Sequence, residues 1–333
     1  AYRKMVASPE IKAALFGKVL GVGALDLKTH PANRKNPHDQ KVAEFVRWNL
    51  AERLTGGFPG LAWTILSGGL IDGISISEKV WTREEKGKHK DLWPLRALKP
   101  KDVGNDVIPL MDSFRNIIGI RGMRYNAGEE FAPADFVIFR HMALYDSPVG
   151  MSDLRAAYLS YWMLDTAWKL RGIALEKRSM PFVWGTYQNS SQQKSLEAML
   201  AVVKSQNWAS VPEGVVLQVL DIAGSADGIF QAATDSLTER IFLSIQGATL
   251  QALLGGAGEQ RGNSKVHKST SDLFKWALAS SVEHLLNDRD TGLVRDIVDL
   301  NFVVEEYPRV SLSAVDIAEM TEEADLDKKL FDM

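Results

Sequence analysis

The chain has 333 residues, of which 45% are hydrophobic and 24% are charged, and its formal net charge is −3. The length predicts two or three compact units or one elongated protomer, and the share of apolar residues excludes an intrinsically disordered chain. The slightly acidic charge argues against a dedicated nucleic-acid binder, which would carry an excess of lysine and arginine, but it is compatible with DNA as a transient passenger.

The sequence also excludes several kinds of covalent and membrane structure. The chain has no cysteine, so disulfides, thiolate zinc sites and cysteine nucleophiles cannot form. The longest apolar stretch, residues 61–70, contains serine, threonine and glycine and falls short of ~20 residues, so no transmembrane helix is expected. Lys12 and Lys18 interrupt any apolar region near the start, so no signal peptide is expected.

The first half of the chain predicts a mixed helix and sheet unit. The expected elements are a short helix around Leu15, a polar loop at 30–37, helices at 39–54 and 61–73, a strand at 74–81 and several short strands within 92–147. Between the strands, residues 83–90 are rich in glutamate and lysine. They are predicted to form a solvated hairpin tip rather than a DNA-contacting patch.

The second half predicts long helices around a small insert. The expected elements are a helix at 152–179 stopped by Pro181, a strand at 182–184, a helix at 190–206, a strand at 215–220, a helix with a period-four apolar stripe from Ile229 to Ile245, a glycine-rich loop at 248–268, a helix at 271–286 that resumes at 293–300, a strand at 303–312 and an acidic helix at 313–329. At ~1.5 Å per residue, the first of these helices is roughly 40 Å long. Two long helices that bracket a small α/β module can run antiparallel as a stalk with the module at its far end.

No catalytic or metal-binding motif is found in the sequence. The chain lacks the G-x-x-x-x-G-K-[ST] phosphate loop, the G-x-S-x-G elbow and the H-E-x-x-H zinc pair. The glycines at 256, 258 and 262 follow a predicted helix rather than a strand, which excludes a dinucleotide fingerprint. Asp288, Asp290 and Gly292 do not match a calcium loop, so a helix kink is expected there. We therefore expect no enzyme activity, no metal and no cofactor.

Short motifs follow one another in a fixed order along most of the chain. They are Trp63, Asp72 with Gly73, 78–81 (EKVW), 136–139 (FVIF), 147–150 (SPVG), 154–157 (LRAA), Tyr161 with Trp162, 176–181 (EKRSMP), 184–187 (WGTY), 211–214 (VPEG) and 244–250 (SIQGATL). No single motif is specific, but their order resembles that of phage portal proteins, most closely the Mu-like branch of that family.

The resemblance implies an α+β, portal-type elongated protomer with long stem helices, a small α/β clip insert and an α/β wing. The expected parts are the wing at 1–150, stem helices at 151–180 and 224–247, the clip at 181–223, the tunnel loop at 248–268, a long kinked helix at 269–302, a wing strand at 303–313 and the start of a crown at 314–333. The implied function is that of a ring-shaped dodecamer at a capsid vertex, a channel through which double-stranded DNA is packaged and ejected. The implied partners are the large terminase subunit, which is the motor, a head–tail connector or adaptor, and the major capsid protein or a scaffold. The implied location is the virion, after assembly in the host cytoplasm.

A closed ring requires two different, complementary faces on each protomer. We expect one face to carry the aromatic side chains of the 152–179 helix, although packing within one subunit is the alternative: Tyr158, Tyr161, Trp162 and Trp168. The glycine-rich segment is expected to contact DNA weakly, unless it is a plain solvent loop, through Gln251, Gln260, Arg261, Asn263, Lys265 and Lys268. Trp184 and Tyr187 are expected either to bind a partner at the clip surface or to serve as ordinary core residues.

Two other classes of protein are weighed against this interpretation. Another ring-forming virion protein, such as a head–tail adaptor, is usually much shorter and lacks paired stalk helices with an insert. A nuclease or hydrolase would bring polar residues together only in three dimensions. The acidic pairs Glu305-Glu306 and Glu322-Glu323 suit such a site less well than they suit solvated helix or strand faces.

Overall fold

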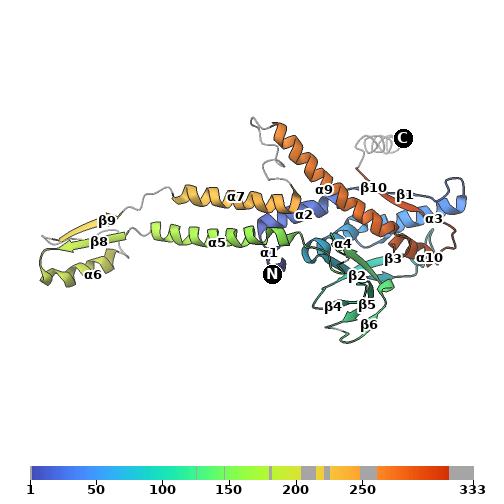
Figure 1. The fold of residues 1–333 in the computed structure, drawn as a ribbon, viewed down its shortest axis with the longest axis horizontal. Coiled ribbons are helices and arrows are strands. Elements are labelled where there is room, and N and C mark those ends of the chain that lie inside the picture. The colour runs from blue at the N-terminus through green and yellow to red at the C-terminus, as the bar shows by residue number, and fades with distance from the viewer. Residues whose placement is uncertain are drawn as a thin grey trace. The chain divides into compact units, whose positions relative to one another are not determined.

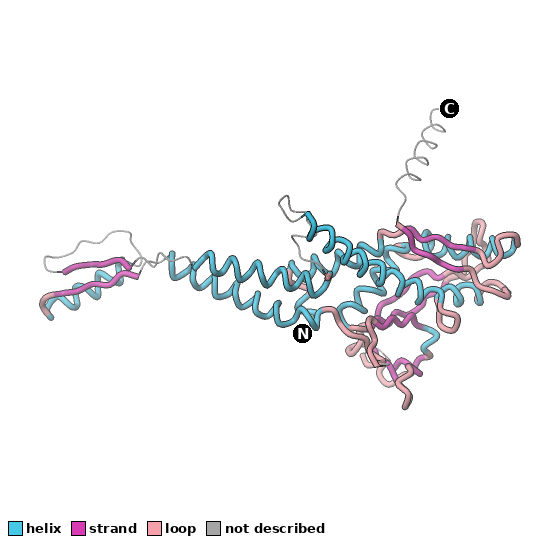
Figure 2. The backbone as a smooth tube through the Cα atoms, turned by 45° about the horizontal axis from the view of Figure 1, so that its top comes forward, coloured by secondary structure: helices cyan, strands magenta, loops and turns pink. Residues whose placement is uncertain are grey.

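The computed structural model describes residues 2–124, 126–145, 147–179, 182–203, 215–220, 226–247 and 261–314. The chain divides into two units, the first built from Ala1–Tyr158 with Ile241–Met333 and the second from Leu159–Arg240. Figure 1 labels the elements in chain order, and Figure 2 distinguishes helices from strands. Both units contain helices and strands, which confirms the predicted α+β class.

Helix α4 (Gly57–Asp72) forms the centre of the first unit. Its buried apolar side chains are Phe58, Leu61, Ala62, Ile65, Leu66 and Leu70. One side of α4 packs against α2 (Pro9–Gly23), which follows the short α1 (Tyr2–Met5), and another side packs on strand β2. A Cβ atom at Gly69 would lie 2.5 Å from the Phe139 ring. Glycine at this position therefore permits the close approach of helix and sheet.

Two three-stranded antiparallel sheets complete the first unit's core. The first has the order β3-β2-β7, and its strands are β2 (Ile74–Trp81), β3 (Leu95–Lys101) and β7 (Phe136–Arg140). The second has the order β4-β5-β6, and its strands are β4 (Val107–Met111), β5 (Ile117–Gly122) and β6 (Glu130–Phe131), with the short helix η2 (Pro133–Asp135) after β6. Residues 82–94 connect β2 to β3 as a hairpin and are exposed at 85–88. That this tip is solvated rather than in contact with DNA stays a prediction.

The predicted helix at 39–54 is observed, but it changes its hydrogen-bonding pattern near its end. Helix α3 (Pro37–Trp48) continues into a π-helical turn, η1 (Asn49–Arg53). Asn49 is fully buried, and its side chain donates to the Leu95 carbonyl at 2.9 Å and accepts from the Leu95 N–H at 3.1 Å. The Asn49 side-chain amide therefore pairs with the backbone N–H and carbonyl of Leu95, the first residue of β3. The wider π-helical turn leaves room for this buried contact.

No single helix among the described residues is long and apolar enough to cross a membrane. Pro37–Arg53 and Gly57–Asp72 pass such a test as a pair bent by 75°, on length and composition only. The second helix of that pair is α4, whose apolar side chains form the core described above.

A two-stranded sheet in the first unit pairs a strand from the N-terminal part of the chain with one from its C-terminal part. Strand β1 (Asp26–His30) pairs antiparallel with β10 (Arg309–Ser313), with Asp26 opposite Ser313. The sequence-based expectation misses β1 altogether, because five residues with charged and polar neighbours show no clear alternation. It also places the last strand too early, at 303–312, whereas the ladder begins only after Pro308, which has no N–H to donate.

The C-terminal helices of the first unit differ from expectation at one end. Helix α9 (Arg261–Asn287) begins at Arg261 rather than at residue 271, so the predicted loop at 248–268 is wrong over its last eight residues, 261–268. Those residues contain one glycine and no proline, and nothing in them prevents helix formation. The predicted kink is confirmed, because the chain breaks at 288–292 and resumes as α10 (Leu293–Asp299). The predicted helix at 313–329 lies almost wholly outside the described residues.

The second unit holds the predicted strand–helix–strand insert. Its elements are β8 (Phe182–Tyr187), η3 (Ser190–Gln192), α6 (Gln193–Val203) and β9 (Val215–Leu220). The strands β8 and β9 are antiparallel, with Phe182 opposite Leu220, and α6 packs on β8. Two long helices flank this insert in the chain, α5 (Leu154–Ser179) before it and α7 (Ala226–Gln246) after it.

Candidate functional site

One face of α5 carries large apolar side chains that are exposed to solvent. We call this set the α5 stripe: Tyr158, Leu159, Trp162, Met163, Leu170 and Ile173. The stripe follows helical periodicity, because its members recur three, four, eleven and fourteen residues after Leu159. At its centre Trp162 is 56% exposed. An exposed aromatic and aliphatic row of this length is typical of an unfilled protein–protein interface.

The other predicted aromatic residues of α5 lie on a different side of the helix. Trp168 is rotated by about 120° from Trp162 around the helix axis, given 3.6 residues per turn. The Arg171 guanidinium lies 5.2 Å from the Trp168 ring centroid, which is a cation–π contact within the chain. Tyr161 is half-buried on the same side as Trp168. The structure therefore separates Tyr158 and Trp162, which belong to the stripe, from Tyr161 and Trp168.

One face of helix α7 exposes mostly small side chains, with Ile229 as a large one among them. Its exposed positions include Ile229, Ala232, Ala233 and Ser236. Thr234, on the opposite side, is buried. Within the second unit, β8 packs against β9 and α6 packs against β8. The two long helices are joined by a hydrogen bond that Arg171 Nη1 of α5 donates to Gln231 Oε1 of α7 at 3.3 Å. Since α7 does not cover the α5 stripe, both helices keep a face for other contacts.

The predicted DNA-facing residues fall into two groups. Gln251 and Gln260 lie outside the described residues. Arg261, Asn263, Lys265 and Lys268 lie in the first turns of α9, not in a loop as expected. The spacing of four and three residues places the backbone positions 261, 265 and 268 on one face of that helix. The basic residues therefore form a helical row.

The predicted clip residues lie on strand β8. Trp184 is 40% exposed and its backbone pairs with Gln218, while the Tyr187 backbone pairs with Val215. Trp184 is therefore not a fully buried core residue, and its contact with a partner stays a prediction.

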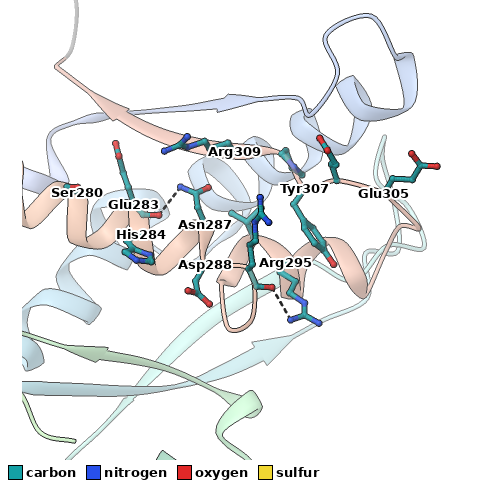
Figure 3. A pocket seen from close by; sticks show the side chains of 13 residues that line it. Ser280, Glu283, His284, Asn287, Asp288, Arg295, Glu305, Tyr307 and Arg309 are labelled. Carbon is teal, nitrogen blue, oxygen red and sulfur yellow. Dashed lines mark hydrogen bonds between the residues drawn. The ribbon is translucent and has the colours of Figure 1, made fainter. Parts of the chain in front are cut away.

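A cavity of about 800 Å³ lies between α9, α10 and the chain before β10 (Figure 3). Two of its charged residues, Asp288 and Arg295, have partners within the chain. The Asp288 carboxylate accepts hydrogen bonds from the N–H groups of Asp290 and Thr291, and the bond from the Thr291 backbone holds the pKa of Asp288 below its ordinary value. Arg295 donates to Asp299 and to the Arg289 carbonyl. Asp288 thus closes the turn between α9 and α10.

No group of three or more potential metal ligands is found in the part of the chain that the structure describes. Beside the cavity next to α10, the Thr291 N–H and hydroxyl both donate to Asp288 Oδ1, so this carboxylate oxygen is already occupied by hydrogen bonds within the turn. The described residues therefore show no cluster of side chains that could hold a metal ion.

A cluster around three buried polar side chains, which we call the root cluster, lies where α5 begins and α7 ends. It consists of Lys18 on α2, His141 after β7, Asp153 before α5, the carbonyl of Ile245 on α7 and the ring of Phe274 on α9. Lys18 Nζ lies 2.7 Å from Asp153 Oδ2 and donates to the Ile245 carbonyl at 3.1 Å. His141 Nε2 lies 2.8 Å from Asp153 Oδ1. The three charged or titratable side chains are each less than 10% exposed.

The charge state of the root cluster follows from these contacts. Burial raises the pKa of Asp153, but the hydrogen bond with His141 and the positive charge of Lys18 outweigh it, and the pKa lies below its ordinary value. The carboxylate is therefore ionised at neutral pH. The sequence analysis did not single out this cluster. The available signal is that Lys18 lies four residues after buried Ala14 and seven after buried Ile11, on the side of α2 that faces the core.

Comparisons with known proteins agree with this architecture. The family described as "Portal protein of Mu bacteriophage" matches residues 1–333. A chain of the "Virion of native gene transfer agent (GTA) particle" is similar in fold, with a TM-score of 0.63 and 12% identity over 98% of this chain and 87% of that one. A chain of the "Neck of empty GTA particle computed with C6 symmetry" has a TM-score of 0.65 and 13% identity, over 97% of this chain and 85% of that one. The crystal structure of an HK97 family phage portal protein from Corynebacterium diphtheriae has a TM-score of 0.52 and 11% identity, over 96% of this chain and 97% of that one.

No curated protein sequence matches the chain. At identities of 11% to 13%, the solved structures establish the fold alone. The family match spans every residue of the chain and agrees with the motif order, the paired long helices and the small insert between them. The protein therefore belongs to the family of Mu bacteriophage portal proteins.

Proposed function

We propose that this protein forms a dodecameric ring at a capsid vertex and that double-stranded DNA passes through the ring during packaging and ejection. The observation that carries the proposal is the α5 stripe, a row of large apolar side chains that the chain leaves exposed. Similarity to neck structures computed with C12 and C6 symmetry supports a cyclic assembly. A protein of this kind acts by its shape and charge, and we expect it to have no enzyme activity of its own.

The two long helices supply the two faces that a closed ring needs. In our proposal, the α5 stripe of one protomer packs against the small side chains of α7 in its neighbour. Ala232, Ala233 and Ser236 leave room for the bulky rings and branched chains of the stripe. Large side chains that enter a surface of small ones give the close packing typical of a stable interface. Because the two faces differ, the contact is head-to-tail and continues from protomer to protomer until the ring closes.

The proposed contact with DNA is weak. B-DNA carries one negative charge per ~1.7 Å of its axis, so a dense ring of cations would hold it in place rather than let it slide. Each protomer offers a short basic row, Arg261, Lys265 and Lys268, in the first turns of α9. We propose that this row, together with the polar residues Gln251, Gln260 and Asn263, guides the DNA along its backbone.

The basic row gives a direct test of this function. We expect the combined change Arg261→Gln, Lys265→Gln and Lys268→Gln to reduce the salt dependence of DNA binding by purified rings. Removing one lysine or arginine that neutralises a phosphate makes the slope of log affinity against log salt less negative by about 0.9. Fluorescence anisotropy with a short duplex over a salt series measures that slope.

A matched control removes the same number of charges elsewhere. Lys35, Lys41 and Lys86 are exposed lysines of the first unit. Their combined change to glutamine is expected to leave the slope as it is in the native protein. Equal slopes for all three proteins would refute the proposed DNA contact while leaving ring formation unaffected.

The energy for DNA transport must come from a partner, since the sequence has no phosphate-binding loop for ATP. We propose that the large terminase subunit supplies it and docks on the second unit at Trp184 and Tyr187. A head–tail connector would bind after packaging, and the major capsid protein or a scaffold would surround the first unit. The proposed location is the portal vertex of the virion, reached after assembly in the host cytoplasm.

A further inference from the structure

We infer that Lys18 is a positioning residue that locks the end of α7 to the start of α5. The inference rests on the proposed function and deepens it, because these two helices would form the contact between neighbouring protomers. All the residues involved belong to the first unit, and they come from elements that are far apart in the sequence.

The Lys18 ammonium group has three N–H donors, and buried partners satisfy them. One contact is with the Asp153 carboxylate at 2.7 Å and another is with the Ile245 carbonyl at 3.1 Å. The ammonium also lies 5.5 Å from the centroid of the Phe274 ring, within the range of a cation–π contact. A buried charge is tolerated only when such partners are held in place. The partners lie before α5, on α7 and on α9, so one side chain connects three long helices.

Lys18 also contacts the last turn of α7. The final carbonyl groups of a helix have no partner within the helix and carry a partial negative charge. Ile245 lies in this turn, so the Lys18 ammonium both donates a hydrogen bond to the helix end and neutralises its partial charge. Gln246 Nε2 adds a hydrogen bond to the Ala14 carbonyl of α2 at 2.8 Å. A Cβ atom at Gly17 would come within 3.0 Å of that same Nε2 atom, so glycine leaves space for the contact.

The chain leaves α7 at Gly247, next to the same cluster. Gly247 has φ of +68°, a conformation that glycine adopts without strain. A Cβ atom there would lie 2.2 Å from the Phe274 ring. Gly247, where the chain leaves α7, is therefore packed against the Phe274 ring, and Lys18 faces that ring as well. If Lys18 is removed, the end of α7, the start of α5 and this departure point lose their shared anchor together.

The start of α5 is fixed by the same cluster. Ser152 caps the helix by accepting the Leu154 N–H at 3.1 Å, and its hydroxyl donates to the Ile71 carbonyl at 2.6 Å. The next residue, Asp153, accepts from His141 and Lys18. Movement of the α7 end would thus pull on Lys18 and, through Asp153, on the first turn of α5.

The test is hydrogen exchange of the full purified chain, followed by mass spectrometry at peptide resolution. We expect Lys18→Met, which keeps the length of the side chain but removes its charge, to speed exchange at 154–158 and at 243–247 by about tenfold or more. A tenfold change corresponds to roughly 1.4 kcal/mol of local stability. Exchange in α3 and α10, which lie outside the root cluster, is expected to stay unchanged. Lys18→Arg, which keeps the positive charge, is expected to restore most of the protection.

Two further variants keep the inference open to refutation. Asp153→Asn is expected to speed exchange at the same two sites, and the double variant Lys18→Met with Asp153→Asn is expected to resemble either single variant, because both remove one shared interaction. Lys41→Met, on the exposed side of α3, is the control and is expected to change nothing. Faster exchange throughout the first unit, faster exchange at one site only, or additive effects in the double variant would each overturn the inference. Ring formation is measured separately by mass photometry. A native chain that stays monomeric would refute the proposed function, while the hydrogen-exchange comparison would still test the role of Lys18.

Discussion

Trp162→Ala is expected to abolish ring assembly at protein concentrations where the native chain is fully assembled. Trp162 lies at the centre of the α5 stripe and is 56% exposed in the single chain. Aromatic residues at the centre of an interface typically cost about 2 kcal/mol or more when truncated, which weakens each contact by roughly 30-fold. The same contact recurs between every pair of neighbours, so the loss is repeated around the ring. Sedimentation velocity over a concentration series measures the effect.

The same helix provides a matched control for this prediction. Trp168 is 49% exposed, close to the value for Trp162, but its ring contacts Arg171 of the same chain. We expect Trp168→Ala to leave rings intact, with at most a small shift in the assembly midpoint. If Trp168→Ala dissociates rings while Trp162→Ala does not, the assignment of the interface to the α5 stripe is wrong.

Gly150→Ala is expected to destabilise the first unit severely. A Cβ atom at Gly150 would lie 2.0 Å from the His141 carbonyl oxygen and 2.4 Å from the Gly73 carbonyl oxygen. These are backbone atoms, and they are held by hydrogen bonds from the His141 N–H to Gly73 at 2.9 Å and from the Met151 N–H to His141 at 2.7 Å. Overpacking against rigid atoms costs about 3 kcal/mol. In a unit of this size, that lowers the thermal midpoint by roughly 6–12 °C.

Gly119→Ala is the control for this substitution in the same unit. A Cβ atom there would meet Leu110 Cδ1 at 3.4 Å, which is ordinary van der Waals contact. Calorimetry of the two variants should show a large fall in melting temperature for Gly150→Ala and little change for Gly119→Ala. Similar melting temperatures for both variants would show that the backbone atoms of Gly73 and His141 do not pack as closely against Gly150 as the structure places them.

Much of the helical architecture could be predicted from the sequence because it follows from periodicity. Apolar residues at helical spacing identified α3, α4, α5 and α7, and Pro181 correctly indicated where α5 must end. The kink after α9 was also predictable, since Asp288 and Gly292 favour a turn over a continued helix. Local patterns of this kind need no knowledge of what the element packs against.

Features that depend on distant partners could not be predicted in the same way. Strand β1 exists because β10 lies beside it, and those two segments are separated by most of the chain. The root cluster brings Lys18 together with Asp153 and Ile245, and no local pattern links these positions. The different surroundings of Trp162 and Trp168 likewise depend on which face of α5 each residue occupies and on the contact with Arg171.

Electron microscopy of the purified full-length chain tests the central claim most directly. The account predicts annular particles with an open central hole, whose class averages show many identical protomers related by rotation about that hole. A chain that remains monomeric at every concentration, with the α5 stripe covered by its own residues, would contradict it.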